Sequence, residues 1–318
     1  MQAGILGKAI ELLGSRQGQA SHVALPVPTA SFCLPNGNRV AYDEFGARQG
    51  FPLIYFHDAG SSRLECAHFH RAAVRHGYRL IAVDRPGIGC TQFYPLQAAA
   101  DFAADVVVLA DHLGLQSFGV LALGAGGIYA ATLAHQEPER VAAVLSIGGI
   151  PGVAFNESSP DSFIASCLQE LTPACVQLIT RIRHALSPDD PEFATMQLES
   201  MLSDTDRKSL AVPRVRQLLA LDHREALRQG SRGVAQDFGT CYRKFDFHLS
   251  TINVPTIIWQ GAADRLSSRA ESEFLVSRIP DATYYRVANR GHFFFVHCMD
   301  EVFDRLRLST ENRASLAA

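Results

Sequence analysis

Short runs of apolar and β-branched residues alternate with longer stretches of helical periodicity from residue 31 onward. This alternation is typical of an α/β protein with a largely parallel sheet. Eight strands are predicted, at residues 31–34, 38–44, 52–57, 79–84, 118–123, 142–147, 256–260 and 283–287. Pro35, Asn36 and Gly37 separate the first two strands and form a hairpin signal, so we expect the sheet to begin with an antiparallel pair.

Helical patterns fill the gaps between the later strands. The clearest helices are predicted at residues 64–76, 98–113, 125–136 and 268–278. Between 151 and 250 the strand signals give way to short helical patterns broken by prolines. A helical insertion between two strands of an open sheet lies over the carboxyl ends of the strands, where such folds bind ligands. We therefore predict a core formed by residues 29–150 and 254–318, with a helical cap inserted at 151–253.

The first 28 residues are expected to lie outside this core. Apolar residues recur at helical spacing over residues 1–14, which favours a short docking helix over a contact with a membrane surface or a partner. Residues 17–28 have the composition of a linker.

Composition excludes several classes of protein. The 29 Lys and Arg residues against 32 Asp and Glu residues leave no basic footprint for nucleic acid, and 47% hydrophobic residues argue against disorder. The longest apolar runs are far shorter than the ~20 residues of a membrane span. Seven cysteines without a CxxC pair favour a reducing, cytoplasmic location. Without a dinucleotide fingerprint, a P-loop or a dense set of metal ligands, we expect no cofactor and no metal.

The strand at 118–123 runs directly into a helix through a glycine-rich turn. A nucleophile elbow has the pattern G-x-S-x-G, which holds a serine in a strained turn beside an oxyanion hole. Residues 122–126 read Ala-Leu-Gly-Ala-Gly, so Gly124 stands at the position of the nucleophile. Glycine adopts a positive φ without strain, but it supplies no nucleophile.

The motifs around this turn resemble those of α/β-hydrolases, in particular a bacterial subfamily that carries FHGTPGSR, DRPGxGxS, VLGxSGGGPYA and a late GHF. The corresponding segments are FHDAGSSR at 56–63, DRPGIGCT at 84–91, LALGAGGIYA at 121–130 and RGHF at 290–293. They occur in the right order. The resemblance implies an α/β-hydrolase fold, with a mostly parallel eight-stranded sheet flanked by helices and a helical cap.

The same resemblance implies a set of site residues. Asp264, which follows a late strand, corresponds to the acid of a catalytic triad, and His292 corresponds to its base. The chain order of elbow, Asp and His is the one that this fold uses. The oxyanion hole would be formed by the backbone N–H of Ala125 together with that of Asp58 or Ala59.

Four departures from the subfamily pattern put ester hydrolysis in question. Gly124 replaces serine, Ala122 replaces the first elbow glycine, Asp58 replaces a glycine, and residues 60–61 are Gly-Ser in place of Pro-Gly. A carboxylate close to a developing oxyanion opposes the positive potential that stabilises it. The sequence leaves open whether Asp58 points into the site or away from it.

Two hypotheses about function follow, each with a small apolar molecule in the capped pocket. In one, His292 held by Asp264 is a general base that acts on a carbonyl or ester compound, by activating water or by a lyase, isomerase or oxygenase type of proton abstraction. In the other, the protein is a non-catalytic ligand-binding or regulatory pseudo-hydrolase. The N-myc downstream-regulated family, with glycine at the elbow, is a similar case. A third hypothesis, engineered inactivation of an ordinary esterase, is opposed by the further departures at Ala122, Ala125 and Asp58.

Overall fold

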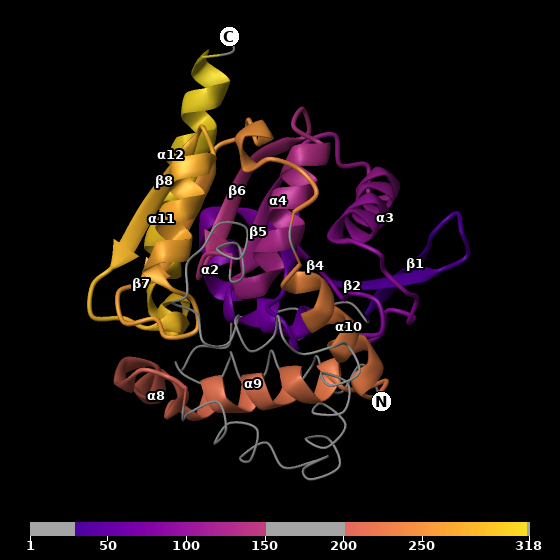
Figure 1. The fold of residues 1–318 in the computed structure, drawn as a ribbon, viewed down its shortest axis with the longest axis horizontal. Coiled ribbons are helices and arrows are strands. Elements are labelled where there is room, and N and C mark those ends of the chain that lie inside the picture. The colour runs from indigo at the N-terminus through magenta and orange to yellow at the C-terminus, as the bar shows by residue number, and fades with distance from the viewer. Residues whose placement is uncertain (1–28, 151–200, 244, 317–318) are drawn as a thin grey trace.

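An eight-stranded sheet runs through the protein, with helices on both of its faces (Figure 1). The computed structural model describes residues 29–150, 201–243 and 245–316. The strand order is β1-β2-β4-β3-β5-β6-β7-β8, and every pairing from β4 to β8 is parallel. The strands are β1 (Ala30–Cys33), β2 (Arg39–Gly46), β3 (Phe51–Phe56), β4 (Tyr78–Val83), β5 (Phe118–Leu123), β6 (Val141–Ile147), β7 (Thr256–Gly261) and β8 (Ala282–Val287).

All eight predicted strands are present, and the limits of each lie within two residues of those predicted. The sheet also begins as expected, because β1 and β2 are antiparallel. In the turn between them Gly37 has a φ of 85°, and the side-chain oxygen of Asn36 accepts the backbone N–H of Asn38 at 2.9 Å. A mostly parallel eight-stranded sheet flanked by helices confirms the predicted fold class.

Side chains along the central strands alternate between two hydrophobic cores, one on each face of the sheet. On β4, Ile81 and Val83 belong to one core, and Leu80 and Ala82 belong to the other. Helices α3 (Ala99–His112), α4 (Gly127–Gln136) and α11 (Arg269–Arg278) cover the first core, and α2 (His70–His76) and α12 (Phe295–Leu316) cover the second. None of the described helices is long and apolar enough to cross a membrane.

Two of the predicted helices begin differently from the prediction. The one predicted at 64–76 is divided at Phe69 into a 3₁₀ turn, η1 (Arg63–His68), and α2. The ring of Phe69 packs against Tyr55 and Phe295, so the break places an aromatic side chain in the core. The one predicted at 125–136 begins with a 3₁₀ turn, η2 (Gly124–Gly126), before α4.

Three helices between residues 201 and 243 lie across one end of the sheet (Figure 1). They are α8 (Asp204–Leu210), α9 (Pro213–Ala226) and α10 (Ser231–Cys241). Helix α9 packs against η1, which follows β3, and α8 packs against η5 (His292–Phe294), which follows β8. They therefore cover the carboxyl ends of the strands. Residues 1–28, with the predicted docking helix and linker, and residues 151–200 of the predicted cap lie outside the described residues, so the limits of the cap stay a prediction.

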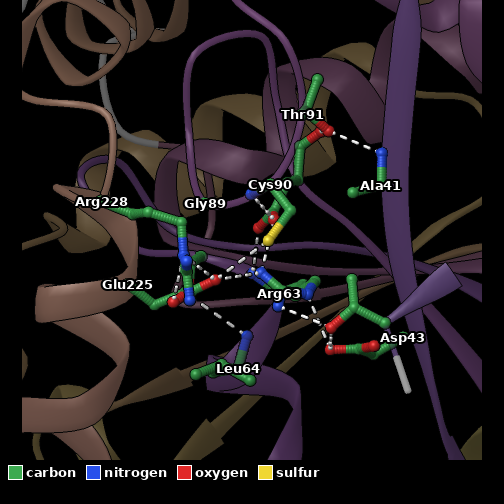
Figure 2. A network of polar contacts seen from close by, with 12 residues as sticks. Ala41, Asp43, Arg63, Leu64, Gly89, Cys90, Thr91, Glu225 and Arg228 are labelled. Carbon is green, nitrogen blue, oxygen red and sulfur yellow. Dashed lines mark hydrogen bonds and ion pairs between the residues drawn. The ribbon is translucent and has the colours of Figure 1, made fainter. Parts of the chain in front are cut away.

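A buried ionic network fastens α9 to the sheet (Figure 2). The Arg63 guanidinium donates to Asp43 of β2 at 2.7 Å, to Asp84 after β4 at 2.6 Å and to Glu225 of α9 at 2.8 Å. All four side chains are 3% exposed or less. Arg63 is therefore the cation that keeps three buried carboxylates together.

Replacement of this cation should destabilise the protein severely. Arg63→Met leaves the three carboxylates buried without their shared partner, and breaking such a pair costs about 3–5 kcal/mol. We expect the free energy of unfolding in urea to fall by about that amount. Arg269→Met is the matched control, because Arg269 pairs with Glu273 at the surface and should contribute about 0.5 kcal/mol or less. A loss below about 1 kcal/mol for Arg63→Met would contradict this assignment.

Candidate active site

The turn between β5 and α4 has the backbone geometry of a nucleophile elbow. Gly124 has a φ of 48°, in the left-handed region that glycine favours, as expected from the sequence. Gly126 allows the end of β3 to approach, because a Cβ there would lie 2.5 Å from the carbonyl oxygens of Phe56 and His57. The elbow and the loop after β3 are thus in direct backbone contact.

His292 and Asp264 form the pair that the sequence predicts. His292 Nδ1 lies 2.9 Å from Asp264 Oδ2, and the two side chains are 3% and 0% exposed. The other Asp264 oxygen, Oδ1, accepts the backbone N–H groups of Leu266 at 2.8 Å and Ser267 at 3.1 Å. Because the carboxylate is fixed on both sides, it directs Nδ1–H of the imidazole toward itself and leaves Nε2 for other partners.

The Asp58 side chain points into the elbow. Its Oδ1 accepts the backbone N–H of Ala125 at 2.7 Å and that of Ala59 at 2.7 Å. Its Oδ2 lies 3.7 Å from His292 Nε2. A Cβ added to Gly124 would lie 2.6 Å from Asp58 Cγ, too close for any real contact. The carboxylate of Asp58 therefore fills the space in which an elbow serine would place its side chain.

This geometry answers the question that the sequence left open about Asp58, and it corrects one assignment. The predicted oxyanion donors were Ala125 together with Asp58 or Ala59. The backbone N–H of Asp58 donates instead to Glu65 Oε2 at 2.9 Å, away from the elbow. The N–H groups of Ala125 and Ala59 converge on one point, and that point is occupied by Asp58 Oδ1. A backbone pattern does not show which of two successive N–H groups turns inward.

Two carboxylates control the charge of His292. Burial alone would lower the pKa of this imidazole, but Asp264 and then Asp58 outweigh burial and raise the pKa well above its ordinary value. The raised pKa favours the imidazolium form, in which Nδ1 donates to Asp264 and Nε2 faces Asp58 Oδ2 at 3.7 Å. In this charged form the ring can donate a proton, and it can accept one only after it has lost its own.

A second buried ion pair holds the loop that carries Asp58. Arg85 pairs with Asp237 of α10, and both side chains are 1% exposed. The Arg85 guanidinium also donates to the carbonyl oxygens of His57 at 2.7 Å and Asp58 at 2.9 Å. Asp237 in turn accepts the N–H of Gly60 at 3.1 Å. These side chains fix the backbone on both sides of Asp58. Their pairing could not be predicted, because Arg85 and Asp237 are far apart in the chain.

A pair of buried carboxyl groups lies on the other side of this loop. Ser61 Oγ is 2.8 Å from Glu65 Oε1 and also contacts Asp222 of α9. A hydroxyl group has one proton, so both contacts are hydrogen bonds only if one carboxyl group is protonated. Asp222 accepts from Ser62 and from the N–H of Glu65, which suits an anion, so the proton belongs on Glu65. Burial raises the pKa of Glu65 to about 8 and that of Asp222 to about 7.

The turn that carries His292 is held by α8. Asp206 is 1% exposed, and its Oδ1 accepts the N–H of Phe293 at 2.8 Å. A Cβ on Gly291 would strike the other oxygen of the same carboxylate, so glycine is required where α8 meets this turn. The role of Asp206 could not be predicted from the sequence, because a lone acidic residue in a helix carries no signal of burial.

Two buried polar side chains, those of His57 and Ser146, have structural roles. Burial lowers the pKa of His57 well below its ordinary value, and the nearby Arg85 lowers it further. The neutral ring donates from Nδ1 to the Asp58 carbonyl oxygen at 2.8 Å, which stabilises the turn after β3. Ser146 is buried and donates to the carbonyl oxygen of Gly149 at 2.9 Å, so it does not replace the missing nucleophile.

One cluster in the described part of the chain has side chains of the kind that bind metal ions. The ligand atoms of Asp84, Cys90 and Glu225 lie within 4.8 Å of one another. The Arg63 guanidinium donates to both carboxylates, however, and thus already supplies the positive charge. Burial also raises the pKa of the Cys90 thiol to about 11, which disfavours the thiolate that a metal needs. We propose no metal there.

A comparison with known families agrees with the geometry. A model described as the alpha/beta hydrolase fold matches residues 52–297, well over half of the chain. The chain belongs to the alpha/beta hydrolase fold family. The narrower resemblance to the bacterial subfamily named above stays a prediction.

Relatives within the alpha/beta hydrolase fold family have different activities in their names. A non-heme chloroperoxidase from Streptomyces lividans is 26% identical over 247 residues, which cover 74% of this chain and 83% of that protein. Epoxide hydrolase B from Mycobacterium tuberculosis is 29% identical over 128 residues, or 36% of each chain. An esterase from Exiguobacterium antarcticum has a TM-score of 0.68 at 17% identity, covering 89% of this chain and 99% of that one. The last likeness shows the fold alone.

The buried pair of Glu65 and Asp222 should make stability depend on pH. The pKa of Glu65 is about 8 in the folded protein against 4.5 ordinarily, so the folded state keeps a proton that the unfolded chain releases. The free energy of unfolding should therefore fall as the pH rises from 5 to 8, by up to about 1.4 kcal/mol per pH unit for one proton. Glu65→Gln, which mimics the protonated acid, should flatten this slope in urea titrations. Glu273→Gln at the surface should leave the slope unchanged, and parallel slopes in all three proteins would contradict the shared proton.

The overlap between position 124 and Asp58 predicts a coupled pair of substitutions. Gly124→Ser alone should destabilise the protein by about 1–3 kcal/mol, because the new side chain would clash with the Asp58 carboxylate and residue 124 has a positive φ. This variant should have no esterase activity. Asp58→Gly together with Gly124→Ser should recover most of this stability. The double variant should also hydrolyse p-nitrophenyl acetate, since the oxyanion donors are freed. Thermal unfolding and ester assays on both single variants and the double variant test this, and an active, fully stable Gly124→Ser protein would contradict it.

Proposed function

We propose that the protein is an enzyme that hydrolyses a small, largely apolar molecule without an elbow serine. One observation carries this proposal. Asp264 and Asp58 lie on opposite sides of the His292 ring, at Nδ1 and Nε2, although residue 124 at the elbow has no side chain. A site that had only lost its serine would leave the oxyanion donors free. Here both donors hold a carboxylate that faces the histidine.

The proposed chemistry depends on proton transfer by His292. Asp264 is buried and accepts two backbone N–H groups, so it keeps the ring in one orientation and stabilises its positive charge. The imidazolium donates its Nε2 proton during the first part of the reaction. The neutral ring that results takes a proton from water, and the water then attacks. No cofactor is needed for these steps.

The substrate class is narrowed by Asp58. The sequence favoured a carbonyl or ester compound, whose developing oxyanion would need the N–H groups of Ala59 and Ala125. Asp58 Oδ1 already accepts both, so the site favours a substrate that does not place its own oxyanion there. The names of the relatives include peroxidase, epoxide hydrolase and esterase chemistry, and the fold does not choose among these.

The second hypothesis is a binding protein without catalysis. The contacts of Asp58 with Ala59, Ala125 and His292 also support it. A carboxylate on two backbone N–H groups beside an imidazolium is a satisfied arrangement that needs no reaction. A ligand would then bind above it, beneath the helices at 201–243. Turnover separates the two hypotheses, since a binding protein returns its ligand unchanged.

His292 provides the decisive variant. His292→Ala should lower turnover by about 10²–10⁴-fold, because both the acid and the base are removed. The substrates assayed are aryl esters, small epoxides and alkyl halides. His112→Ala is the matched control, since this exposed histidine stacks on Phe32 far from the elbow. Equal turnover by His292→Ala and the parent would contradict the proposal, and a complete lack of turnover in the parent would favour the binding protein.

A further inference from the structure

We infer that Asp58 is the nucleophile of this site, displaced from the elbow to the loop after β3, and that it attacks a saturated carbon bearing an oxygen or halogen leaving group. The substrate class is therefore an epoxide or an alkyl halide, and the intermediate is an ester of Asp58. This inference rests on the proposed hydrolytic function and deepens it. The serine has been replaced in function by a carboxylate that reaches the same space from a neighbouring strand.

The two oxygens of Asp58 have different surroundings. Oδ1 accepts two backbone N–H groups at 2.7 Å each, from Ala59 and Ala125. Oδ2 accepts no such bond from the described residues and lies 3.7 Å from His292 Nε2. The side chain is 27% exposed, whereas that of Asp264 is 0% exposed. Asp58 therefore presents one oxygen fixed by two backbone donors and one oxygen without a backbone donor, in a side chain that is partly exposed.

The donors on Oδ1 identify the step that they stabilise. When Oδ2 forms an ester with the substrate, Oδ1 becomes its carbonyl oxygen and stays between the N–H groups of Ala59 and Ala125. Attack of water on Asp58 Cγ then places a negative charge on Oδ1, where two donors are already aligned. A carboxylate that served only as a base would not need an oxyanion hole around its own oxygen. The site is built to hydrolyse an ester of Asp58.

Both steps balance without any further reagent. In the first, a lone pair of Oδ2 forms a bond to carbon, and the bond from that carbon to the leaving group breaks. The opened epoxide oxygen takes the proton that His292 gives up, directly or through water, whereas a halide leaves as an anion and the proton goes to solvent. In the second, neutral His292 takes a proton from water, and hydroxide adds to Cγ. The Cγ–Oδ2 bond breaks, the alkoxide is protonated by His292, and the new carboxyl group returns a proton to the ring.

The charge of His292 changes in the required direction during this cycle. The negative charge of Asp58 is one of the causes that raise the pKa of His292, and an ester of Asp58 has no such charge. The pKa of the imidazole therefore falls once the ester has formed. The ring becomes a base at the stage at which water must be activated.

The same arrangement argues against an acyl substrate. Attack on a carbonyl carbon creates an oxyanion on the substrate, which would need donors that Asp58 Oδ1 already holds. Displacement at a saturated carbon creates no oxyanion on the attacked carbon. Because Asp58 Oδ1 occupies the N–H groups of Ala59 and Ala125, the site favours attack on a saturated carbon over attack on a carbonyl carbon.

The test uses styrene oxide and 1-bromobutane as probes of the two leaving groups. Each is incubated with the full chain carrying His292→Ala, and the peptide that contains Asp58 is examined by mass spectrometry. We expect a covalent adduct on Asp58 from at least one probe, because the ester forms and its hydrolysis is blocked. The probe that reacts identifies the leaving group. The adduct should be absent when Asp58→Asn is added, and the surface variant Asp111→Asn is the control for charge.

A second experiment follows oxygen atoms in the parent protein. With enzyme in excess over probe in H₂¹⁸O, the label should enter the Asp58 carboxylate in the first turnover and leave the product unlabelled. Asp58→Asn should reduce turnover by about 10⁴-fold or more. Label found directly in the product, with dependence on His292 retained, would overturn the nucleophile but keep the proposed function. Turnover of aryl esters alone, without an adduct, would likewise overturn the nucleophile and keep the proposed function. A complete lack of turnover and of adduct would overturn both the nucleophile and the proposed function.

Discussion

The contact between the Asp58 carboxylate and the backbone N–H of Ala125 is the interaction on which the rest of the site depends. It joins the loop after β3 to the elbow after β5, and it explains why residue 124 has no side chain. It also places a second carboxylate beside His292, so that the imidazole carries a positive charge. A neutral or outward-pointing residue at position 58 would leave the donors of the elbow empty and the histidine with one partner.

Holding a carboxylate in this position requires a rigid loop, and the loop is held from both sides. Arg85 and Asp237 bind its carbonyl and N–H groups on one side, while Glu65 accepts the N–H of Asp58 on the other. Asp237 and Asp222 come from α10 and α9, so the helices over the carboxyl ends of the strands help to hold the loop that carries Asp58. Burying this many charges stabilises the fold only if every partner is present, which makes the site sensitive to single substitutions.

The sequence was sufficient for the sheet and for half of the site. Short apolar, β-branched runs that alternate with helical patterns located all eight strands, and the order of motifs placed Asp264 and His292 after β7 and β8. The orientation of the Asp58 side chain could not be predicted, because a single residue in an irregular loop belongs to no periodic pattern. The partnership of Arg85 with Asp237 was equally hidden, since charged residues give the same pattern at the surface as in a buried pair.

The missing serine should therefore be interpreted together with Asp58. If the serine had simply been lost, Gly124 would leave a small cavity and two backbone donors without a partner, and such donors are costly when buried. The structure has no such defect, because a carboxylate from 66 residues earlier in the chain fills the space and takes both donors. The inward side chain of Asp58 thus requires a residue without a side chain at position 124. In the mechanism proposed above, the nucleophile moves from the elbow to the loop after the neighbouring strand β3, and its chemistry changes from that of a hydroxyl group to that of a carboxylate.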